Sequence, residues 1–449
     1  MTLNSSRRVF LKSSALAGVV FGAAPRSLMR SVFAAEGTRA RKKTFVVVFQ
    51  RGACDGLNTV VPYGDSGYRK SRPSIAIPSP KDGDLAAAVD LNGHFGLHPA
   101  LADLAPLYRN GSLGIVHAVG SPDTSRSHFD CQDFMESGTP GLKSTSDGWM
   151  NRCSATLPKT DSKFRSVALT QTLPRVLRGA SPAVALARID DFHVREDIAM
   201  AEGGGMMRSG RRNAGARDAS GATERKAGDD SSAAAFEKLY GDAAKDMLGN
   251  AGRETFEAIE ALKVADPSKY SPSAGASYPR GRLGDSLKQM AQLIKADLGV
   301  ELAFVDLGGW DHHTAEGAST GQLANLLRQL GGSLSAFNHD LGDRMSDVVV
   351  MTMTEFGRTV RENGNRGTDH GHGSVSFVMG GPVRGGKVYG KFPKLSEEKL
   401  YEGRDLPVTT DFRDLVGEVL ARHIGVADLK PVFPNYDVKS SNFVGAIRS

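Results

Sequence analysis

The chain has 449 residues and carries 56 Lys and Arg against 50 Asp and Glu, a formal net charge of +6. Five of the basic residues and no acidic residue lie within residues 1–34, so the rest of the chain holds 51 basic against 50 acidic residues, a net charge of +1. This balance excludes a strongly basic surface and gives no support to a nucleic acid as partner.

The first predicted element is an export signal at the N-terminus. Residues 6–12, Ser-Arg-Arg-Val-Phe-Leu-Lys, precede a weakly apolar run over residues 13–24. A paired arginine before such a run is typical of a twin-arginine signal peptide, and the run is too short and too rich in Gly, Ala and Ser to span a bilayer. We therefore predict a signal peptide over residues 1–34, the twin-arginine translocase as partner during export, and a periplasmic or surface-exposed mature protein with no stable membrane span.

Five short apolar runs rich in β-branched residues are typical of buried parallel strands. They cover residues 44–49, 113–117, 301–306, 347–353 and 374–379. Amphipathic segments with apolar residues on one helical face lie between and after them, over residues 283–294, 323–337 and 411–423. This alternation predicts an α/β fold with a mainly parallel sheet that is covered by helices on both sides.

The middle of the chain departs from this alternation. Residues 201–235 are dense in Gly, Ala, Ser, Arg and Asp and have no apolar periodicity, so we expect a flexible, disordered insertion at about 200–235. One domain over residues 44–435, assembled from segments at about 44–195 and 280–435, is predicted, although the length also fits two or three domains. The three cysteines, Cys54, Cys131 and Cys153, have no metal-type spacing and predict no particular disulfide.

Polar segments lie next to the predicted strands, where an open parallel sheet usually binds its ligands. They cover residues 50–58, 125–130, 308–314, 354–359 and 368–373. Their oxygen and nitrogen donors together suit zinc, manganese or iron, or magnesium or calcium if the histidines do not bind the metal.

Each polar residue also has an ordinary interpretation when it is taken singly. Asp311 could cap a turn, and His313 or His370 could be a satisfied, partly buried histidine. Glu355 and Arg358 could form a plain ion pair. The recurrence of such residues at the same end of successive strands nevertheless favours a metal site.

Five motifs, together with the leader, carry a resemblance to a known family. They are Arg-Gly-Ala-Cys-Asp-Gly-Leu-Asn at 51–58, Ser-His-Phe-Asp-Cys-Gln-Asp-Phe-Met-Glu-Ser-Gly at 127–138, Gly-Trp-Asp-His-His at 309–313, Thr-Glu-Phe-Gly-Arg-Thr at 354–359 and Gly-Thr-Asp-His-Gly at 367–371. With these motifs the chain resembles the exported bacterial domain-of-unknown-function family numbered fifteen hundred and one, over nearly the whole mature chain. Such proteins are similar at fold level to the alkaline phosphatase and sulfatase superfamily. The resemblance implies a three-layer α/β/α sandwich with a metal-dependent site for ester hydrolysis.

The resemblance also implies roles for single residues, assigned by the order of the motifs. Asp55 resembles the superfamily's metal-bridging aspartate of the first strand. Asp311 and His313 resemble ligands of the other metal, and His370 looks like the late metal histidine. Ser127 stands where the superfamily places its nucleophile at a helix N-terminus. The alternative role for Ser127 is that of an ordinary helix N-cap.

One segment departs from the superfamily pattern. After the fourth strand an adjacent Asp-His pair is usual, whereas this chain has Glu355, with Arg358 further on. Arg358 would then replace a cation and hold an anionic group bidentately. Alternatively, one loop offers three compensating ligands, namely Asp369, His370 and His372.

The expected function is metal-assisted hydrolysis of a phosphate or related ester in a small molecule or polymer, with zinc as the first expectation for the metal. The candidate metal ligands are Asp55, Asp311, His313, Glu355, Asp369, His370 and His372. Ser127 or a bound water would attack, and Arg51 or Arg358 would offset charge in the transition state. Cys54 lacks the Cys-x-Pro-x-Arg context of sulfatases, which disfavours their mechanism. The alternative is a non-catalytic envelope protein that keeps the fold and binds a polymer or partner protein.

Overall fold

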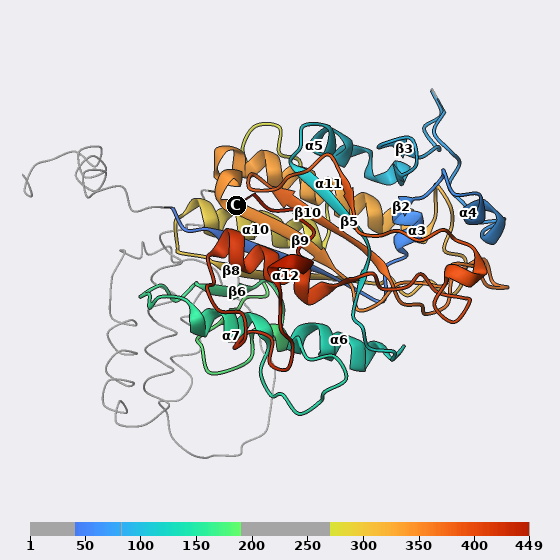
Figure 1. Ribbon diagram of the computed structural model, residues 1–449. Helices are drawn as coiled ribbons and strands as arrows, with labels where there is room; N and C mark the ends of the chain where they lie inside the picture. Colours follow the sequence, from blue (N-terminus) through green and yellow to red (C-terminus); the bar gives the residue numbers. More distant parts are fainter. Residues whose placement is uncertain (1–40, 82, 190–269, 449) are drawn as a thin grey trace, which may run out of the picture. The chain divides into compact units, whose positions relative to one another are not determined.

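The centre of the fold is a mixed, mostly parallel β-sheet of nine strands (Figure 1). The computed structural model describes residues 41–81, 83–189 and 270–448, and every count below refers to these residues. The strands follow the order β11-β5-β10-β9-β1-β8-β6-β7, and β12 also pairs with β5. Their bounds are β1 (Thr44–Arg51), β5 (Leu113–Gly120), β6 (Ser166–Ala168), β7 (Val184–Ala185), β8 (Leu302–Gly308), β9 (Val348–Met353), β10 (Ser374–Gly380), β11 (Val388–Tyr389) and β12 (Thr410–Asp411).

The five predicted strands correspond to β1, β5, β8, β9 and β10. β1 lies between two partners from the second half of the chain, with Val47 opposite Phe304 on β8 and opposite Met351 on β9, both in parallel register. Residues 44–51, 302–308 and 348–353 therefore lie side by side in one sheet.

One strand direction differs from the sequence-based expectation. β10 runs antiparallel to β9 and to β5, so its predicted parallel orientation is wrong. The apolar pattern of a buried strand carries no information on its direction, and no helix connects β9 to β10 to force a parallel crossover. As a consequence, the segment that precedes β10 lies at the edge where β1, β5 and β9 end.

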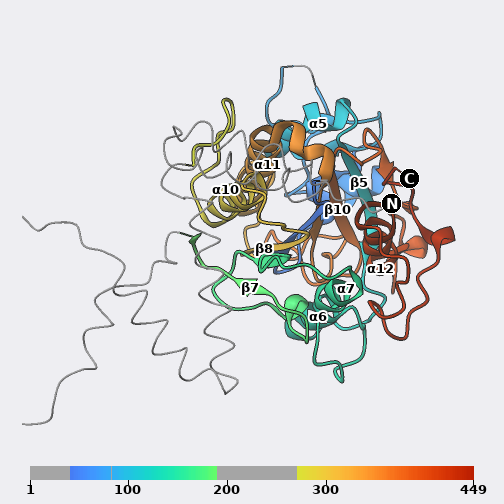
Figure 2. The same cartoon turned by 90° about the vertical axis from the view of Figure 1, so that its left-hand side faces the viewer.

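Helices cover both faces of the sheet and form a three-layer α/β/α arrangement (Figure 2). One layer contains α5 (Ala105–Arg109), α10 (Arg282–Lys295) and α11 (Gln322–Leu341), and the other contains α6 (His128–Ser137), α7 (Trp149–Thr156) and α12 (Phe412–Val419). Side chains of β1 alternate between the two cores. Val46 and Val48 belong to the core with α10 and α11, and Phe45 and Val47 to the core with α7 and α12.

Shorter elements complete the described fold. A small antiparallel sheet has the order β2 (Val60–Val61), β4 (Gly96–Leu97), β3 (Val89–Asp90). The remaining helical turns are α3 (Gly56–Thr59), α4 (Ser66–Ser71), η1 (Pro99–Leu104), η2 (Arg175–Leu177), η5 (Gly342–Asp347), η6 (Glu397–Lys399), η7 (Leu420–Ile424) and η8 (Ser440–Asn442). The helix predicted over 411–423 is thus α12 followed by the π-helical turn η7.

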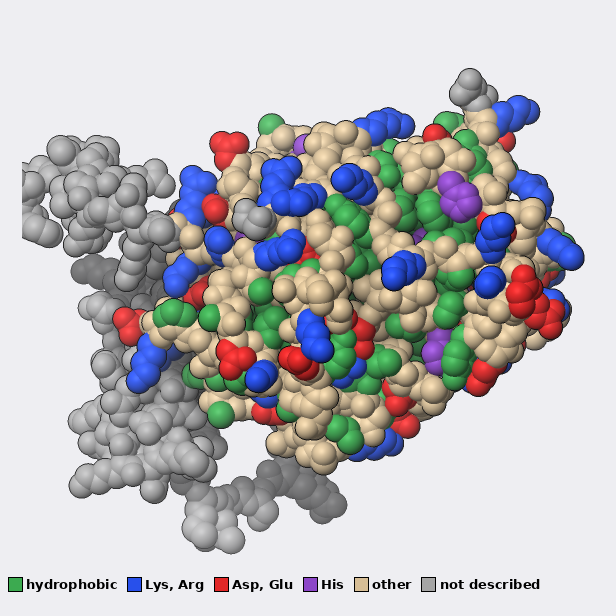
Figure 3. Space-filling view, in the orientation of Figure 1, with side chains coloured by type: hydrophobic (Ala, Val, Ile, Leu, Met, Phe, Trp, Pro, Cys, Tyr) green, Lys and Arg blue, Asp and Glu red, His purple; other side chains and the backbone are tan. Residues whose placement is uncertain are grey.

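Two sequence-based predictions lie outside the described residues. They are the signal peptide over residues 1–34 and the insertion at about 200–235. Within the described residues, none of the helices combines the length and the apolar character that a membrane crossing requires. Cys54, Cys131 and Cys153 are buried free thiols. Positive and negative side chains are interspersed over the face shown in Figure 3, which agrees with the near-neutral charge of residues 35–449.

Candidate metal centre

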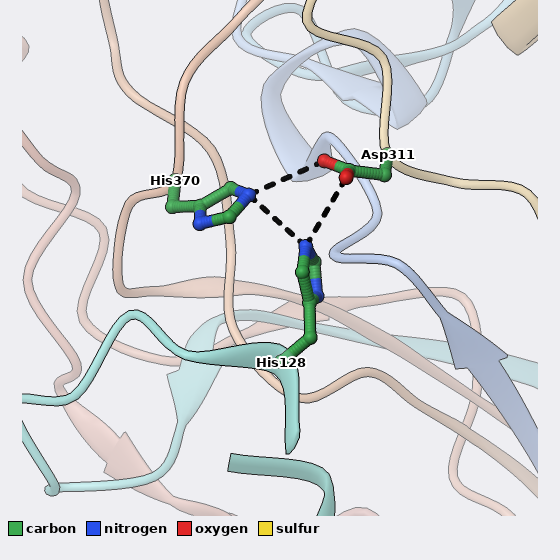
Figure 4. Close-up of side chains that lie close together, drawn as sticks. All are labelled: His128, Asp311 and His370. Carbon is green, nitrogen blue, oxygen red and sulfur yellow. Dashed lines mark hydrogen bonds and ion pairs between the residues drawn. The ribbon is translucent and has the colours of Figure 1, made fainter. Parts of the chain in front are cut away.

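Three loops bring a cluster of two histidines and one aspartate to the carboxyl edge of the sheet (Figure 4). His128 is the first residue of α6, Asp311 follows β8, and His370 precedes β10. Nε2 of His370 lies 3.0 Å from Nε2 of His128 and 3.3 Å from Oδ1 of Asp311. Nε2 of His128 lies 3.4 Å from Oδ2 of Asp311. The potential ligand atoms of all three residues lie within 4.8 Å of one another, which is the spacing of a metal site.

His313 adds a fourth donor to this cluster. Its Nε2 lies 2.9 Å from Nε2 of His370 and 3.0 Å from Oδ1 of Asp311. The side chains of His128 and His370 are each 23% exposed, whereas those of Asp311 and His313 are 43% and 42% exposed. We call these four residues the histidine cluster. Its exposed side would admit a substrate from solvent.

Each imidazole of the histidine cluster is held in place through its other ring nitrogen. All three Nδ1 atoms lie within hydrogen-bond distance of an oxygen acceptor: Oε1 of Glu355 for His128 (2.8 Å), Oδ1 of Asp369 for His313 (3.1 Å) and the carbonyl of Arg126 for His370 (2.8 Å). A carboxylate or carbonyl can only accept, so each Nδ1 carries a proton, and in a neutral ring Nε2 keeps its lone pair. Metal-binding histidines in proteins are oriented by this kind of partner.

Gly52 allows the loops after β1 and β8 to approach each other. It has a φ of +117°, and a Cβ atom there would lie only 2.8 Å from the backbone nitrogen of Asp311 and 2.9 Å from that of Trp310. A side chain at this position would therefore push Asp311 away from its histidines.

Arg358 joins the loops that carry the cluster. Its buried guanidinium donates to the carboxylate of Asp311. It also donates to four backbone carbonyls, those of Gly52, Ala53, Trp310 and Thr368. Since its donors are committed to protein acceptors, Arg358 positions Asp311 and leaves little capacity for the anionic group expected from the sequence.

The charges around the cluster keep the aspartate ionised. Burial raises the pKa of Asp311, but the hydrogen bond and charge of Arg358, together with His128 and His313, outweigh burial and lower the pKa to about 2. The hydrogen bond to Glu355 raises the pKa of His128, whereas burial lowers the pKa of His370. Near neutral pH the cluster thus offers an anionic oxygen beside at least one neutral imidazole.

Glu355 and Asp369 lie next to the cluster, but on the far side of its rings. Glu355 is buried, and its Oε1 accepts from the backbone N–H of Gly52 at 2.7 Å and from Nε2 of Gln132 at 2.9 Å, in addition to His128. Asp369 also accepts from Asn363, at 3.0 Å. Through these contacts both carboxylates hold the histidine rings from behind and do not point into the cluster.

Asp55 and His372 do not join the histidine cluster. Asp55 is buried in a bidentate ion pair with Arg72 and caps α3 through the backbone N–H of Leu57. Nδ1 of His372 lies 3.4 Å from Oδ2 of Asp405. These two residues therefore lie outside the candidate metal site.

Two predicted catalytic residues have other contacts. Ser127 is the N-cap of α6, where its hydroxyl accepts from the backbone N–H of Asp130 at 3.5 Å. Arg51 donates to Asp306 at 2.8 Å and to Oε1 of Gln132 at 2.9 Å, and it is paired with Glu136. Ser127 precedes His128 directly, so its hydroxyl belongs to the same loop as the cluster.

The sequence-based ligand set missed His128 and its neighbour Gln132. His128 stands in a polar segment after the predicted second strand, directly beside Ser127, whose hydroxyl the family resemblance makes the candidate nucleophile. Gln132 lies one helical turn later, so both side chains reach the same carboxylate of Glu355. A histidine at the start of a helix after a buried strand was the signal that could have identified this ligand.

Comparisons with known proteins support the family resemblance. The family model described as "Protein of unknown function (DUF1501)" matches residues 111–433. No curated protein matches the sequence. Among solved structures, the crystal structure of the PsFucS1 sulfatase from Pseudoalteromonas sp. aligns with 12% sequence identity and a TM-score of 0.37, covering 95% of this chain and 78% of that chain. The α/β assignment rests on the sheet itself, and sulfatase activity is a property of that neighbour alone.

Proposed function

Since the chain belongs to the family described as protein of unknown function DUF1501, whose description names no activity, we propose from its own side chains that it binds a divalent metal ion and hydrolyses phosphate or related esters. The metal ligands in this proposal are His128, Asp311 and His370, with His313 as the fourth donor.

The orientation of the histidine rings is the observation that carries this proposal. With Nδ1 of each ring donating to an oxygen, the Nε2 lone pairs of His128 and His313 both face Nε2 of His370 at about hydrogen-bond distance. Lone pairs that face one another repel, so the arrangement calls for a cation between them. A proton on one ring would serve this purpose, and a metal ion would satisfy the remaining nitrogen and the carboxylate as well.

The donor set favours zinc. Imidazole nitrogens with one carboxylate oxygen form a common zinc site, in which three protein ligands leave the fourth position to substrate, and His313 as a further donor would make the metal five-coordinate. Manganese and iron accept the same donors, whereas magnesium and calcium prefer oxygen ligands throughout. A divalent metal ion, when bound, polarises an ester oxygen and lowers the pKa of water.

The other residues have positioning roles in this proposal. Glu355 and Asp369 fix the rings of His128 and His313, and Arg358 fixes Asp311. Ser127, at the N-terminus of α6, is the candidate nucleophile, with a water molecule as the alternative. The variant Ser127→Ala separates these roles: a cap alone would cost about 1 kcal/mol of stability, whereas loss of a nucleophile lowers the rate by several orders of magnitude.

The cluster gives a direct test. The protein, purified without chelator, should contain a stoichiometric divalent metal and should hydrolyse at least one ester in a chromogenic panel of phosphate and sulfate esters. The variant His370→Ala should lose both properties, and His339→Ala, which replaces an exposed histidine of α11, should lose neither. Metal without turnover would support a binding role instead, and the absence of metal would refute the proposal.

Export through the twin-arginine pathway is a separate part of the proposal. It rests on residues 6–12 and the short apolar run that follows. Replacing Arg7 and Arg8 together by lysine should retain the chain in the cytoplasm, as measured by fractionation of cells that express the full sequence. A variant with Arg26 and Arg30 replaced by lysine is the matched control and should be exported normally.

A further inference from the structure

A polar cavity of about 370 Å³ lies beside the histidine cluster. We call it the arginine cavity, because four of its eleven lining residues are arginines: Arg51, Arg175, Arg178 and Arg282. Only two carboxylates, Glu136 and Asp306, line it as well, which leaves a lining charge of +2. Arg282 comes from α10, whereas Glu136 comes from α6 on the opposite face of the sheet (Figure 2).

The arginines differ in how far their charge is already compensated. Arg51 and Arg282 share Asp306, at 2.8 and 2.6 Å. Arg175 is paired with Asp133 and donates to the carbonyl of Thr145, but its side chain is 21% exposed and each terminal nitrogen has a second N–H group. Arg178 is exposed, donates through Nε to the carbonyl of Leu173, and has no carboxylate partner in the described part of the chain. Arg175 and Arg178 therefore have donors to offer a ligand.

Two side chains, Gln132 and Glu355, connect the arginine cavity to the histidine cluster. The Oε1 of Gln132 accepts from Arg51, which lines the cavity, and its Nε2 donates to Glu355, which holds His128. Gln132 itself lines the cavity. The cavity and the cluster are therefore neighbours that share one hydrogen-bonded wall.

A second cavity continues away from the cluster. It has a volume of about 430 Å³ and shares Thr170, Gln171 and Arg282 with the arginine cavity. The two cavities thus have common walls and offer room for an extended molecule. The described lining of the arginine cavity contains no aromatic side chain on which a nucleobase could stack.

We propose that the arginine cavity is a substrate subsite that binds a second anionic group, a sulfate, phosphate or carboxylate, of an oligomeric polyanion other than nucleic acid. This inference deepens the proposed function, because the scissile ester of the same molecule would lie at the histidine cluster. Arg178 and Arg175 supply the recognition, and Arg51 and Arg282 are already held by Asp306.

The test uses the full chain and a fluorescein-labelled heparin hexasaccharide as the polyanionic probe, followed by fluorescence anisotropy. The variant Arg178→Gln should weaken binding about 10-fold, since it removes a charge-assisted contact. The control Arg109→Gln, which replaces another exposed arginine outside both cavities, should bind as the wild type does. Equal binding by Arg178→Gln and the wild type, or no binding by the wild type, would overturn the proposal.

Two further measurements separate the possible failures. An oligothymidylate of similar charge should compete poorly with the hexasaccharide, and equally tight binding would overturn the exclusion of nucleic acid. The effect of Arg178→Gln should persist in the His370→Ala background. If it persists while the wild-type protein hydrolyses no ester, the subsite stands and the proposed function fails. If esters are hydrolysed and Arg178→Gln has no effect on binding, the function stands and the subsite fails.

Discussion

Two aspartates of this chain, Asp55 and Asp311, each follow a strand of the sheet and each bind an arginine, yet their surroundings differ. The Asp55 and Arg72 side chains are 3% and 0% exposed, and Arg72 also donates to the carbonyls of Thr359 and Val360. Asp311 is 43% exposed and faces three histidines. A carboxylate at the end of a strand is therefore insufficient to predict a metal ligand. Access from solvent and nearby imidazole nitrogens distinguish the histidine cluster, which we also call the open cluster, from the buried ion pair of Asp55 and Arg72.

A buried glutamate, Glu316, lies with the buried ion pair of Asp55 and Arg72. We call these three residues the sealed region. Glu316 accepts from the hydroxyl of Thr368 at 2.9 Å through Oε2, while its Oε1 has no donor among the described residues. Burial, together with the charge of Asp55, raises the pKa of Glu316 well above its ordinary value of 4.5. A protonated Glu316 that donates to Asp55 accounts for both observations.

The largest expected effect tests the open cluster. The variant His370→Ala should reduce kcat/KM for a hydrolysed ester by at least about 1000-fold, or about 4 kcal/mol of transition-state stabilisation, because the metal ligands lose their central nitrogen. Its unfolding free energy in the absence of metal should stay within about 1 kcal/mol of wild type, since the side chain is partly exposed. Full activity in His370→Ala would show that the open cluster is not the catalytic site.

The sealed region should respond in the opposite way. The variant Arg72→Met should lower the unfolding free energy by about 3 kcal/mol or more, because it leaves Asp55 buried without its cation. Chemical denaturation measures this loss. The control Arg69→Met removes an exposed arginine of the adjoining helix α4 and should change stability only slightly. If Arg72→Met lost bound metal but kept its stability, Asp55 would belong to a metal site, which contradicts its assignment to a structural ion pair.

A smaller effect is expected at the carboxylate behind His128. The variant Glu355→Gln should weaken metal binding about 10- to 100-fold, because a neutral amide is a poorer acceptor for the ring that it orients. Competition with a chromogenic chelator gives the affinity. The variant Glu362→Gln, at a carboxylate that accepts from Ser74 and Ile75, should leave the affinity unchanged.

The smallest effect concerns pH. The raised pKa of Glu316 means that the folded chain keeps a proton which the unfolded chain releases above pH 4.5. The unfolding free energy should therefore fall as pH rises above 4.5 toward the raised pKa, by about 1.4 kcal/mol for each pH unit at most. Denaturation of Glu316→Gln over the same pH range should lack this component. Identical pH profiles of the two proteins would mean that Glu316 is ionised in the folded chain.

The sequence was most informative where local pattern decides structure. The five long strands and the helices around Leu287 and Leu327 were predictable, because apolar runs and helical spacing reflect burial directly. The proximity of Asp311 and His313 followed from the rule that ligands gather at the carboxyl edge of a parallel sheet, whereas His370 reaches this edge because β10 is antiparallel.

The remaining features depend on contacts between distant residues. Asp55 lies outside the histidine cluster because it forms an ion pair with Arg72. Arg72 follows a short helix, and no motif in the sequence links it to a carboxylate. The role of Glu355 depended on which ring nitrogen it contacts, a matter of side-chain geometry rather than spacing. The sequence also does not indicate the direction of β10, since a strand with only buried side chains has the same apolar pattern in either orientation.

The central position of β1 has a consequence for biosynthesis. This strand is among the first parts of the fold to leave the ribosome, yet its neighbours β8 and β9 are residues 302–308 and 348–353. Both edges of an apolar strand thus stay unpaired until most of the polypeptide has been translated, and such edges promote aggregation. We therefore expect newly made chains to require chaperone protection until translation is nearly complete.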